Sequence, residues 1–239
     1  MARGRSPGYD DQREMILARA AHLFADRGYF ATSMNQVAEA CGLSKATLYH
    51  YYTDKYSLLV SIAETHVTKL DELVTDVEAQ ALAPEARLRE LIRRIVEEYS
   101  GAQDAHRVLT EDVKFLEPDD RQRVLDKERA VVAGFARAVV ALRPDLKKAA
   151  LAKPLTMLLF GMINWMFTWM RDDGMLDHAG MAPVVADLFL GGLPAVKKPV
   201  RAHPVRAELV EAAAAVHPGT PFDKLRAIGP KGSVRTGGR

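Results

Sequence analysis

Two short helices joined by a tight turn are predicted in the first quarter of the chain, and this stretch constrains the fold more than any other. Ser33 and Gln36 have the spacing of a capping box, which begins a helix. Gly42 follows the apolar residues of that helix, at a place where a left-handed backbone favours glycine. Ser44 is a good N-cap for a second helix, and Leu48 supplies its inward face. The spacing predicts a helix-turn-helix.

The remaining residues of the second helix suit a surface that reads DNA. Small and polar side chains let the start of a helix enter a major groove, while Lys, Tyr and His reach phosphates and base edges. Lys55 opens the next helix, where its charge opposes the helix dipole unless a phosphate lies beside it. The same pattern also occurs in folds that bind no DNA. The residues of this surface expected to contact DNA are Ser44, Lys45, Ala46, Thr47, Tyr49, His50 and Lys55.

The sequence around this motif resembles the TetR/AcrR family of bacterial transcriptional repressors. SKATLYHYYTDKYSLL, from residue 44, is similar to the family pattern S-x-G-T-L-Y-x-Y-F-x-S-K-E-x-L. AAHLFADRGYFATSMNQVAEA, from residue 20, is similar to A-x-x-L-F-x-x-x-G-Y-x-x-T-S-x-x-x-I-A-x-A. Thr32 and Ser33 match positions of this pattern that often contact phosphate, so the resemblance implies that they also contact DNA. Two positions depart from the pattern: Ala46 replaces a glycine on the reading face, and Tyr56 replaces an acid. With that acid missing, we expect Thr53 to cap the next helix without a capping box.

The resemblance implies a ligand-responsive regulator that binds palindromic operator DNA as a homodimer and is released by a small effector. The helix-turn-helix domain is predicted at residues 9–58, and the effector-binding and dimerisation domain at 59–196. The family fold is all-α, with a three-helix head on a larger helical body. The residues alone agree, because strand signals are scarce and apolar residues recur mostly every three or four positions.

Helices are expected from Asp10 or Asp11, then over 53–80, from Pro84 to Gly101, and over 102–116, 118–142, 145–153, 154–170 and 181–193. The run 154–170 is apolar nearly all round but short for a membrane span, so we expect no membrane role. With 181–193 it resembles the last two helices of the family, which form a four-helix dimer interface.

The resemblance also implies an effector pocket in the body. The expected effector-binding residues are His106, Phe115, Phe160, Asn164 and Trp165, although each aromatic one, taken singly, fits a core better than a pocket. The stretches INWMFTW and ADLFLGGL are similar to family members that sense acyl-CoA thioesters, so an acyl-CoA such as phenylacetyl-CoA is the expected effector. His66 is expected to be packed or solvated rather than to bind ligand.

Motifs of other function classes are missing from the sequence. It contains no Gly-rich phosphate loop, no G-x-S-x-G elbow and no Cys/His cluster with metal-ligand spacing, so we expect no enzyme activity, cofactor or metal. An architectural or nonspecific DNA-binding protein is the alternative, and an all-helical acyl-processing enzyme using His106 and Asp112 is a weaker one. Cys41 is expected to be a small core residue rather than a redox switch. With no signal peptide visible, a cytoplasmic location is expected.

The two ends of the chain differ in composition from the rest. Residues 1–8 form a predicted flexible basic arm, and Arg3 and Arg5 either enter a minor groove or remain solvated. Residues 197–239 carry nine Lys or Arg against three acids and are predicted to be disordered. Part of this tail also resembles translated intergenic repeats of bacterial genomes, which makes it a read-through appendage; nonspecific DNA affinity is the rival interpretation.

Overall fold

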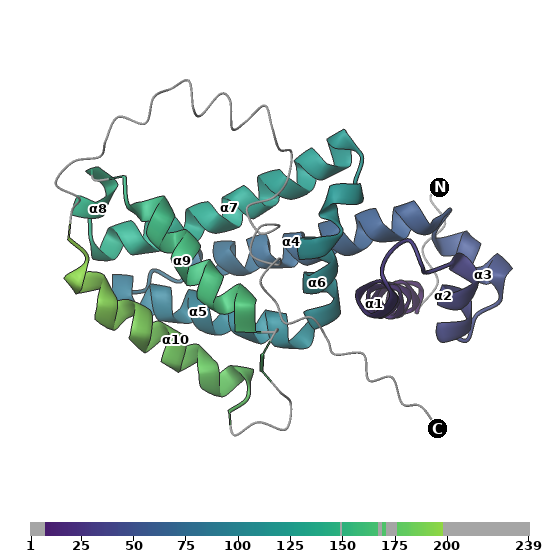
Figure 1. Cartoon of the computed structure of the whole chain (residues 1–239), viewed down its shortest axis with the longest axis horizontal. Coiled ribbons are helices and arrows are strands. Elements are labelled where there is room, and N and C mark those ends of the chain that lie inside the picture. Colours follow the sequence, from purple (N-terminus) through teal and green to yellow (C-terminus); the bar gives the residue numbers. More distant parts are fainter. Residues whose placement is uncertain (1–7, 149, 167–168, 171–175, 198–239) are drawn as a thin grey trace, which may run out of the picture. The chain divides into compact units, whose positions relative to one another are not determined.

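The computed structural model describes residues 8–148, 150–166, 169–170 and 176–197, which form helices and connecting turns without a strand (Figure 1). These residues belong to one compact unit, Met1–Pro199. The all-α expectation is confirmed. Most of the predicted arm and tail lies outside the described residues.

Three helices form the head: α1 (Tyr9–Arg27), α2 (Met34–Ala40) and α3 (Lys45–Tyr51). The predicted capping box is present, since the Gln36 N–H donates to Ser33 Oγ at 3.3 Å and the Ser33 N–H donates to Gln36 Oε1 at 2.8 Å. Gly42 adopts φ +65°, as the turn requires. Ser44 caps α3 by accepting the Thr47 N–H at 3.1 Å. The predicted turn chemistry is therefore correct in detail.

Two predicted caps are wrong. Helix α1 has Gly8 as its N-cap, with φ +88° and no side-chain bond, and Asp10 and Asp11 lie inside its first turn. Helix α4 (Lys55–Ala79) is capped by Asp54, not Thr53. The Ser57 N–H donates to Asp54 Oδ1 at 2.7 Å, and the Asp54 N–H donates to Ser57 Oγ at 3.3 Å. A capping box is present after all, with serine in place of the usual Glu or Gln.

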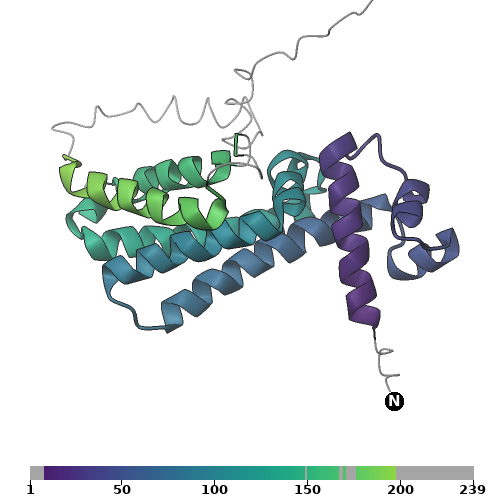
Figure 2. The ribbon, with the colours of Figure 1, turned by 90° about the horizontal axis from the view of Figure 1, so that it is seen from below.

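Helix α4 connects the head to the body and packs against α1, α5, α6 and α7 (Figures 1 and 2). The other body elements are α5 (Pro84–Gly101), α6 (Gln103–Glu111), η1 (Val113–Phe115), α7 (Pro118–Leu142), α8 (Asp145–Lys148), α9 (Ala152–Trp165), α10 (His178–Gly192) and η3 (Leu193–Ala195). The helix expected over 102–116 is shorter, because α6 ends at Glu111 and the chain tightens into η1. Pro118 opens α7 and disfavours helical backbone just before it.

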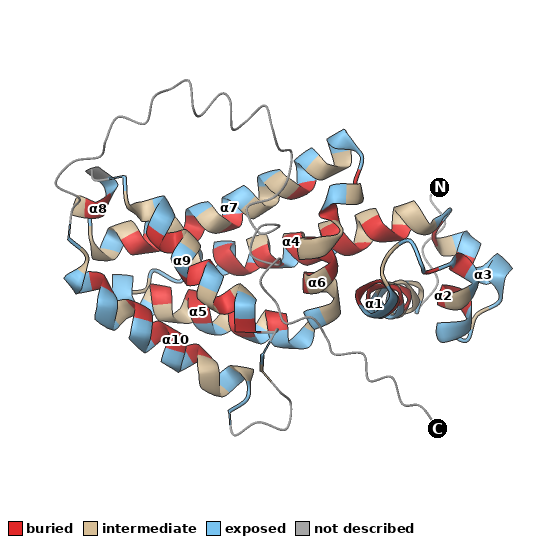
Figure 3. Cartoon of the chain, viewed as in Figure 1, coloured by how far each residue is buried: buried red, intermediate tan, exposed pale blue. Residues whose placement is uncertain are grey.

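Buried residues form continuous stripes where the helices face one another (Figure 3). The core runs through α4, α5 and α7 and continues onto the inner sides of α9 and α10. The outer sides of these last two helices instead expose large apolar side chains, among them Leu158, Trp165, Val184 and Leu188. In the part of the chain that the structure describes, no helix has the length and apolar character needed to cross a membrane.

Candidate DNA interface and effector cavity

The start of α3 forms an exposed polar surface at the tip of the head. Leu48 is fully buried and holds the helix against the core, so the opposite side faces outward. Lys45 Nζ lies 5.8 Å from the centroid of the Tyr49 ring, which places a positive charge and an aromatic ring side by side. Seven of the predicted DNA-contact residues are exposed here: Ser33, Ser44, Lys45, Ala46, Thr47, Tyr49 and His50.

Thr32 departs from the prediction. It is only 2% exposed, and its hydroxyl donates to the carbonyl oxygens of Leu23 at 3.2 Å and of Gly28 at 3.0 Å. These bonds tie the end of α1 to the start of α2. The Thr32 side chain is therefore a structural clamp rather than a phosphate contact.

Lys55 departs from it as well. Its ammonium group donates to the carbonyl oxygens of Tyr29 at 2.7 Å, Phe30 at 3.3 Å and Thr32 at 2.8 Å, and it lies 4.5 Å from the Tyr29 ring centroid. Burial lowers the pKa of this lysine. These carbonyl oxygens offset the unfavourable helix dipole without a phosphate, so a DNA contact by Lys55 stays a prediction.

Tyr56, the other departure from the family pattern, joins the head to the body. Its hydroxyl donates to Asp120 Oδ2 at 2.6 Å and accepts the Glu117 N–H at 2.8 Å. Phe115 lies at the same junction, with its ring centroid 4.6 Å from that of Phe30 and 5.9 Å from that of Tyr29. The Phe115 ring therefore packs against the head, and its expected effector role stays a prediction.

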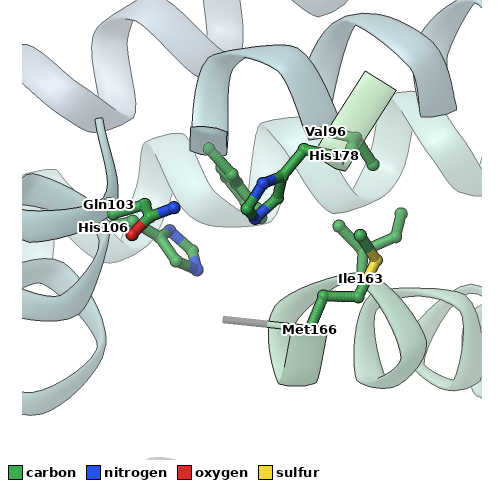
Figure 4. Close-up of a pocket in the computed structure, with 7 residues that line it drawn as sticks. Val96, Gln103, His106, Ile163, Met166 and His178 are labelled. Carbon is green, nitrogen blue, oxygen red and sulfur yellow. The ribbon is translucent and has the colours of Figure 1, made fainter. Parts of the chain in front are cut away.

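A small cavity lies in the body between α5 and α6 on one side and α9 and α10 on the other (Figure 4). It leaves about 10 Å³ for the centre of a water molecule, which is room for about one water. Its lining residues are Val96, Tyr99, Gln103, His106, Ile163, Met166 and His178.

Of the predicted effector residues, only His106 lines this cavity. Phe160 is buried against Phe135, with ring centroids 4.8 Å apart, and Trp165 is 49% exposed. Asn164 Oδ1 is buried and lacks a hydrogen-bond partner among the described residues, yet it does not border the cavity. Phe160, Asn164 and Trp165 are therefore not brought together with His106 as a site.

His66, which was expected to take no part in a site, touches His106 behind the cavity wall. His66 Nε2 lies 3.3 Å from His106 Nδ1, and the Tyr99 ring stacks on His106 with centroids 3.7 Å apart. Burial lowers the pKa of His66 to about 4 and that of His106 to about 3. Sequence reasoning missed Tyr99, Gln103 and His178, because they come from three helices and share no local pattern.

Cys41 is half-buried, and burial raises the pKa of its thiol, as expected for a packing residue. Among the described residues, no group of three or more His, Cys, Asp or Glu side chains is placed to hold a metal ion.

Comparison with known proteins places both parts of the chain in one family. Residues 16–62 match the model of bacterial regulatory proteins of the tetR family, and residues 81–193 match the tetracyclin repressor-like C-terminal domain. A TetR-family transcriptional regulator from Bordetella parapertussis 12822 is 35% identical in sequence. Its solved structure aligns with a TM-score of 0.73, over 80% of this chain and all of that one.

Two further relatives are more distant or only partly covered. The HTH-type transcriptional activator FasR of Mycolicibacterium smegmatis is 35% identical over 97 residues, which are 41% of this chain and 42% of FasR. The chain thus spans less than half the length of that curated relative. The structure of AibR in complex with isovaleryl coenzyme A and operator DNA is 24% identical, with a TM-score of 0.63 over 74% of this chain and 97% of that one. The two family models, and the structural match over 80% of the chain, show that the chain belongs to the TetR family of transcriptional regulators.

Proposed function

We propose that the chain is a repressor that binds a palindromic operator as a homodimer and leaves it when an acyl-CoA effector binds. The exposed start of α3 carries this proposal, because Lys45, Thr47, Tyr49 and His50 project from a helix held by the buried Leu48. A helix end with these side chains fits a major groove, where Lys reaches phosphates or guanine and Thr reaches base edges. Ala46 leaves its position on this surface without a polar group.

The outer faces of α9 and α10 support a dimer. Leu158 and Leu188 are each 65% exposed, and Val184 is 46% exposed, although such side chains are usually buried. A cluster of this kind on two neighbouring helices is typical of a protein interface. A two-fold axis through it would present two α3 helices to successive major grooves, about 34–36 Å apart.

The acyl-CoA effector is supported by AibR, whose fold this chain shares and whose structure holds isovaleryl coenzyme A together with operator DNA. Phenylacetyl-CoA is one member of the class. The cavity has room for about one water, so an acyl group needs a wider form of the body. A ligand that binds only this wider form shifts the population toward it and away from operator spacing.

Transcription assays distinguish a repressor from an activator, the role named for FasR. Deleting the gene should raise transcription from the bound promoter if the protein represses, and lower it if the protein activates.

Footprinting and fluorescence anisotropy on fragments from upstream of its own gene test the proposal. Purified protein should protect a two-fold-symmetric site, and Lys45→Ala with Tyr49→Ala should weaken binding at least about tenfold. Acetyl-, isovaleryl-, octanoyl-, phenylacetyl- and glutaryl-CoA are then added, with free coenzyme A as the control. At least one thioester should raise the operator Kd about tenfold or more.

Each failure has a separate meaning. Protection without symmetry, on every fragment alike, would show an architectural DNA-binding protein instead. A symmetric footprint that no thioester in the panel disturbs would remove the acyl-CoA class but leave the regulator.

A further inference from the structure

A pair of buried histidines lies beside the cavity: His106 lines it, and His66 contacts His106 without lining it. His66, from α4, is 2% exposed and His106, from α6, is 4% exposed, and their ring nitrogens lie 3.3 Å apart. In a neutral pair, one ring donates the shared hydrogen bond and the other accepts it. One added proton can be shared across this contact, whereas a second would place two like charges side by side.

Most of the surface that the cavity exposes is apolar, and four of its lining residues have polar side chains. Tyr99, Gln103, His106 and His178 bring a hydroxyl, an amide and imidazoles, while Val96, Ile163 and Met166 offer apolar surface (Figure 4). None of the lining residues that the structure describes is acidic. All four polar side chains can donate hydrogen bonds, and the imidazoles become cationic when protonated. Such a lining suits a molecule with an apolar body and an anionic end.

We propose that the effector is an acid, and that its carboxylate is buried beside the His66–His106 pair, which takes up a proton as the ligand binds. This inference rests on the proposed function, because it names the chemistry of the effector end that enters the body. A carboxylate in a water-poor cavity requires a compensating charge. The molecule that carries the carboxylate is either a free organic acid or an acyl-CoA whose acyl group ends in a carboxylate.

Other titratable groups lie near the pair, and in this inference the two imidazoles take up the proton that balances the carboxylate. Burial lowers the pKa of both histidines and keeps the pair neutral in the free protein. The charge of Lys69 on α4 lowers the pKa of His66 further, and that of His66 lowers the pKa of His106. Tyr99 on α5 and His178 on α10 line the cavity. Glu128 on α7 does not line the cavity, but its charge adds to burial in raising the pKa of Tyr99. Burial raises the pKa of Glu128 itself to about 7.

The direction of the pH effect follows from linkage. The free pair has pKa values of about 4 and about 3, and a neighbouring carboxylate raises the first of these. At a pH between the pKa of the free pair and its raised pKa in the complex, the complex holds one proton more than the separate protein and ligand. Affinity for the acid therefore strengthens as the pH falls, by up to about tenfold per pH unit.

Isothermal titration calorimetry with two matched ligand pairs tests this inference. Glutaryl-CoA and pentanoyl-CoA differ only in the terminal carboxylate, and phenylacetate and phenylacetamide form the corresponding pair without coenzyme A. Titrations at pH 6.5 in phosphate and in a high-ionisation-enthalpy buffer count the protons taken up. The acid of one pair should bind at least about tenfold more tightly than its neutral partner and take up about one proton, while the neutral partner takes up none. The pair that responds identifies the source of the carboxylate.

Variants locate the proton. His66→Gln with His106→Gln should lose both the preference for the acid and the proton uptake, while thermal melting and operator binding by anisotropy show that the fold persists. His22→Gln, which removes an exposed partner of Asp104, and Glu128→Gln should leave the proton count unchanged. If the double variant does not melt cooperatively, the number of protons that the wild-type protein takes up with each matched ligand pair tests the inference by itself.

Equal affinities within both pairs, uptake of no proton, or loss of uptake in Glu128→Gln would each overturn the inference. So would a lack of binding by all four probes in a protein whose operator affinity still responds to another acyl-CoA; the proposed function would then stand. Failure to bind any operator would instead count against the proposed function itself.

Discussion

At the scale of single residues, two lysines of the head have different roles. Lys45 is exposed on α3, and its ammonium lies near the Tyr49 ring. Lys55 begins α4, and its ammonium holds three carbonyl groups of the loop that follows α1. We therefore expect the same side chain to serve recognition at one position and stability at the other.

Replacing each lysine by methionine separates these roles. Lys55→Met leaves carbonyl acceptors unsatisfied and should lower the free energy of unfolding by about 1–2 kcal/mol. Lys45→Met should leave that free energy unchanged within about 0.5 kcal/mol but weaken operator binding and reduce its salt dependence by about one counterion. Urea denaturation and anisotropy at several salt concentrations measure the two effects. A stable Lys55→Met protein with weak operator binding would restore the phosphate role of Lys55.

The histidine pair predicts a loss of stability in acid. Unfolding releases both imidazoles to the ordinary pKa of 6.5, whereas the folded values are about 4 and about 3. The unfolded chain thus binds more protons below pH 6.5, and stability falls as the pH falls toward 4, by up to about 1.4 kcal/mol per pH unit for each histidine.

Comparing wild-type protein with His66→Gln/His106→Gln at pH 7, 6, 5 and 4.5 by urea denaturation checks this effect. The double variant should lose less stability than the wild type over the range, even if it is less stable at pH 7. Parallel curves would show that the pair titrates normally in the folded state.

At the scale of elements, α4 and α7 approach unusually closely where they cross. A Cβ added to Gly134 of α7 would lie 2.2 Å from Val74 Cγ1 of α4. Val74 is 2% exposed, and its β-branched side chain has little freedom to rotate in a helix. The glycine therefore sets the separation of the two helices, and with it the position of the connecting helix that carries the head.

Gly134→Ala should lower the free energy of unfolding by about 1–3 kcal/mol, because the helices must move apart to accept the methyl group. Val74→Ala creates a cavity and is also destabilising, but it removes the clash. The double variant should accordingly be more stable than the sum of the two single effects predicts, by at least about 0.5 kcal/mol. Strict additivity in urea denaturation would mean that Gly134 does not control the crossing.

At the scale of the whole molecule, the exposed apolar faces of α9 and α10 are the surface through which we expect two copies to associate. Leu188 is 65% exposed in the middle of α10. Burying such a side chain in a dimer is favourable by about 1.5–3 kcal/mol for each copy. The operator geometry of the proposed function depends on this association.

Leu188→Glu should weaken self-association by about a hundredfold or more, because each copy would bury a carboxylate in the interface. Light scattering during gel filtration should show a dimer for the wild type and a monomer for the variant, which should also lose operator affinity. Gln122→Glu, an equal charge change on the exposed side of α7, is the matched control. A wild-type monomer, or a dimer that survives Leu188→Glu, would place the interface elsewhere.

The sequence by itself determined the features that depend on residues a few positions apart. Ser33 and Gln36, Gly42 and the cap at Ser44 were predictable, since each bond spans three residues and needs no other element. The outward side chains of α3 followed from helical spacing around Leu48. Within that range, chain geometry alone brings the partners together.

Only the tertiary structure decided the roles of Lys55, Tyr56 and His66. Their partners lie more than 20 positions away: Thr32 for Lys55, Asp120 for Tyr56 and His106 for His66. No periodic pattern encodes such contacts, because they arise where one helix crosses another. The helix-turn-helix of the head can thus be predicted from the sequence. The contacts of Lys55, the attachment of the head to the body and the chemistry of the cavity follow from packing.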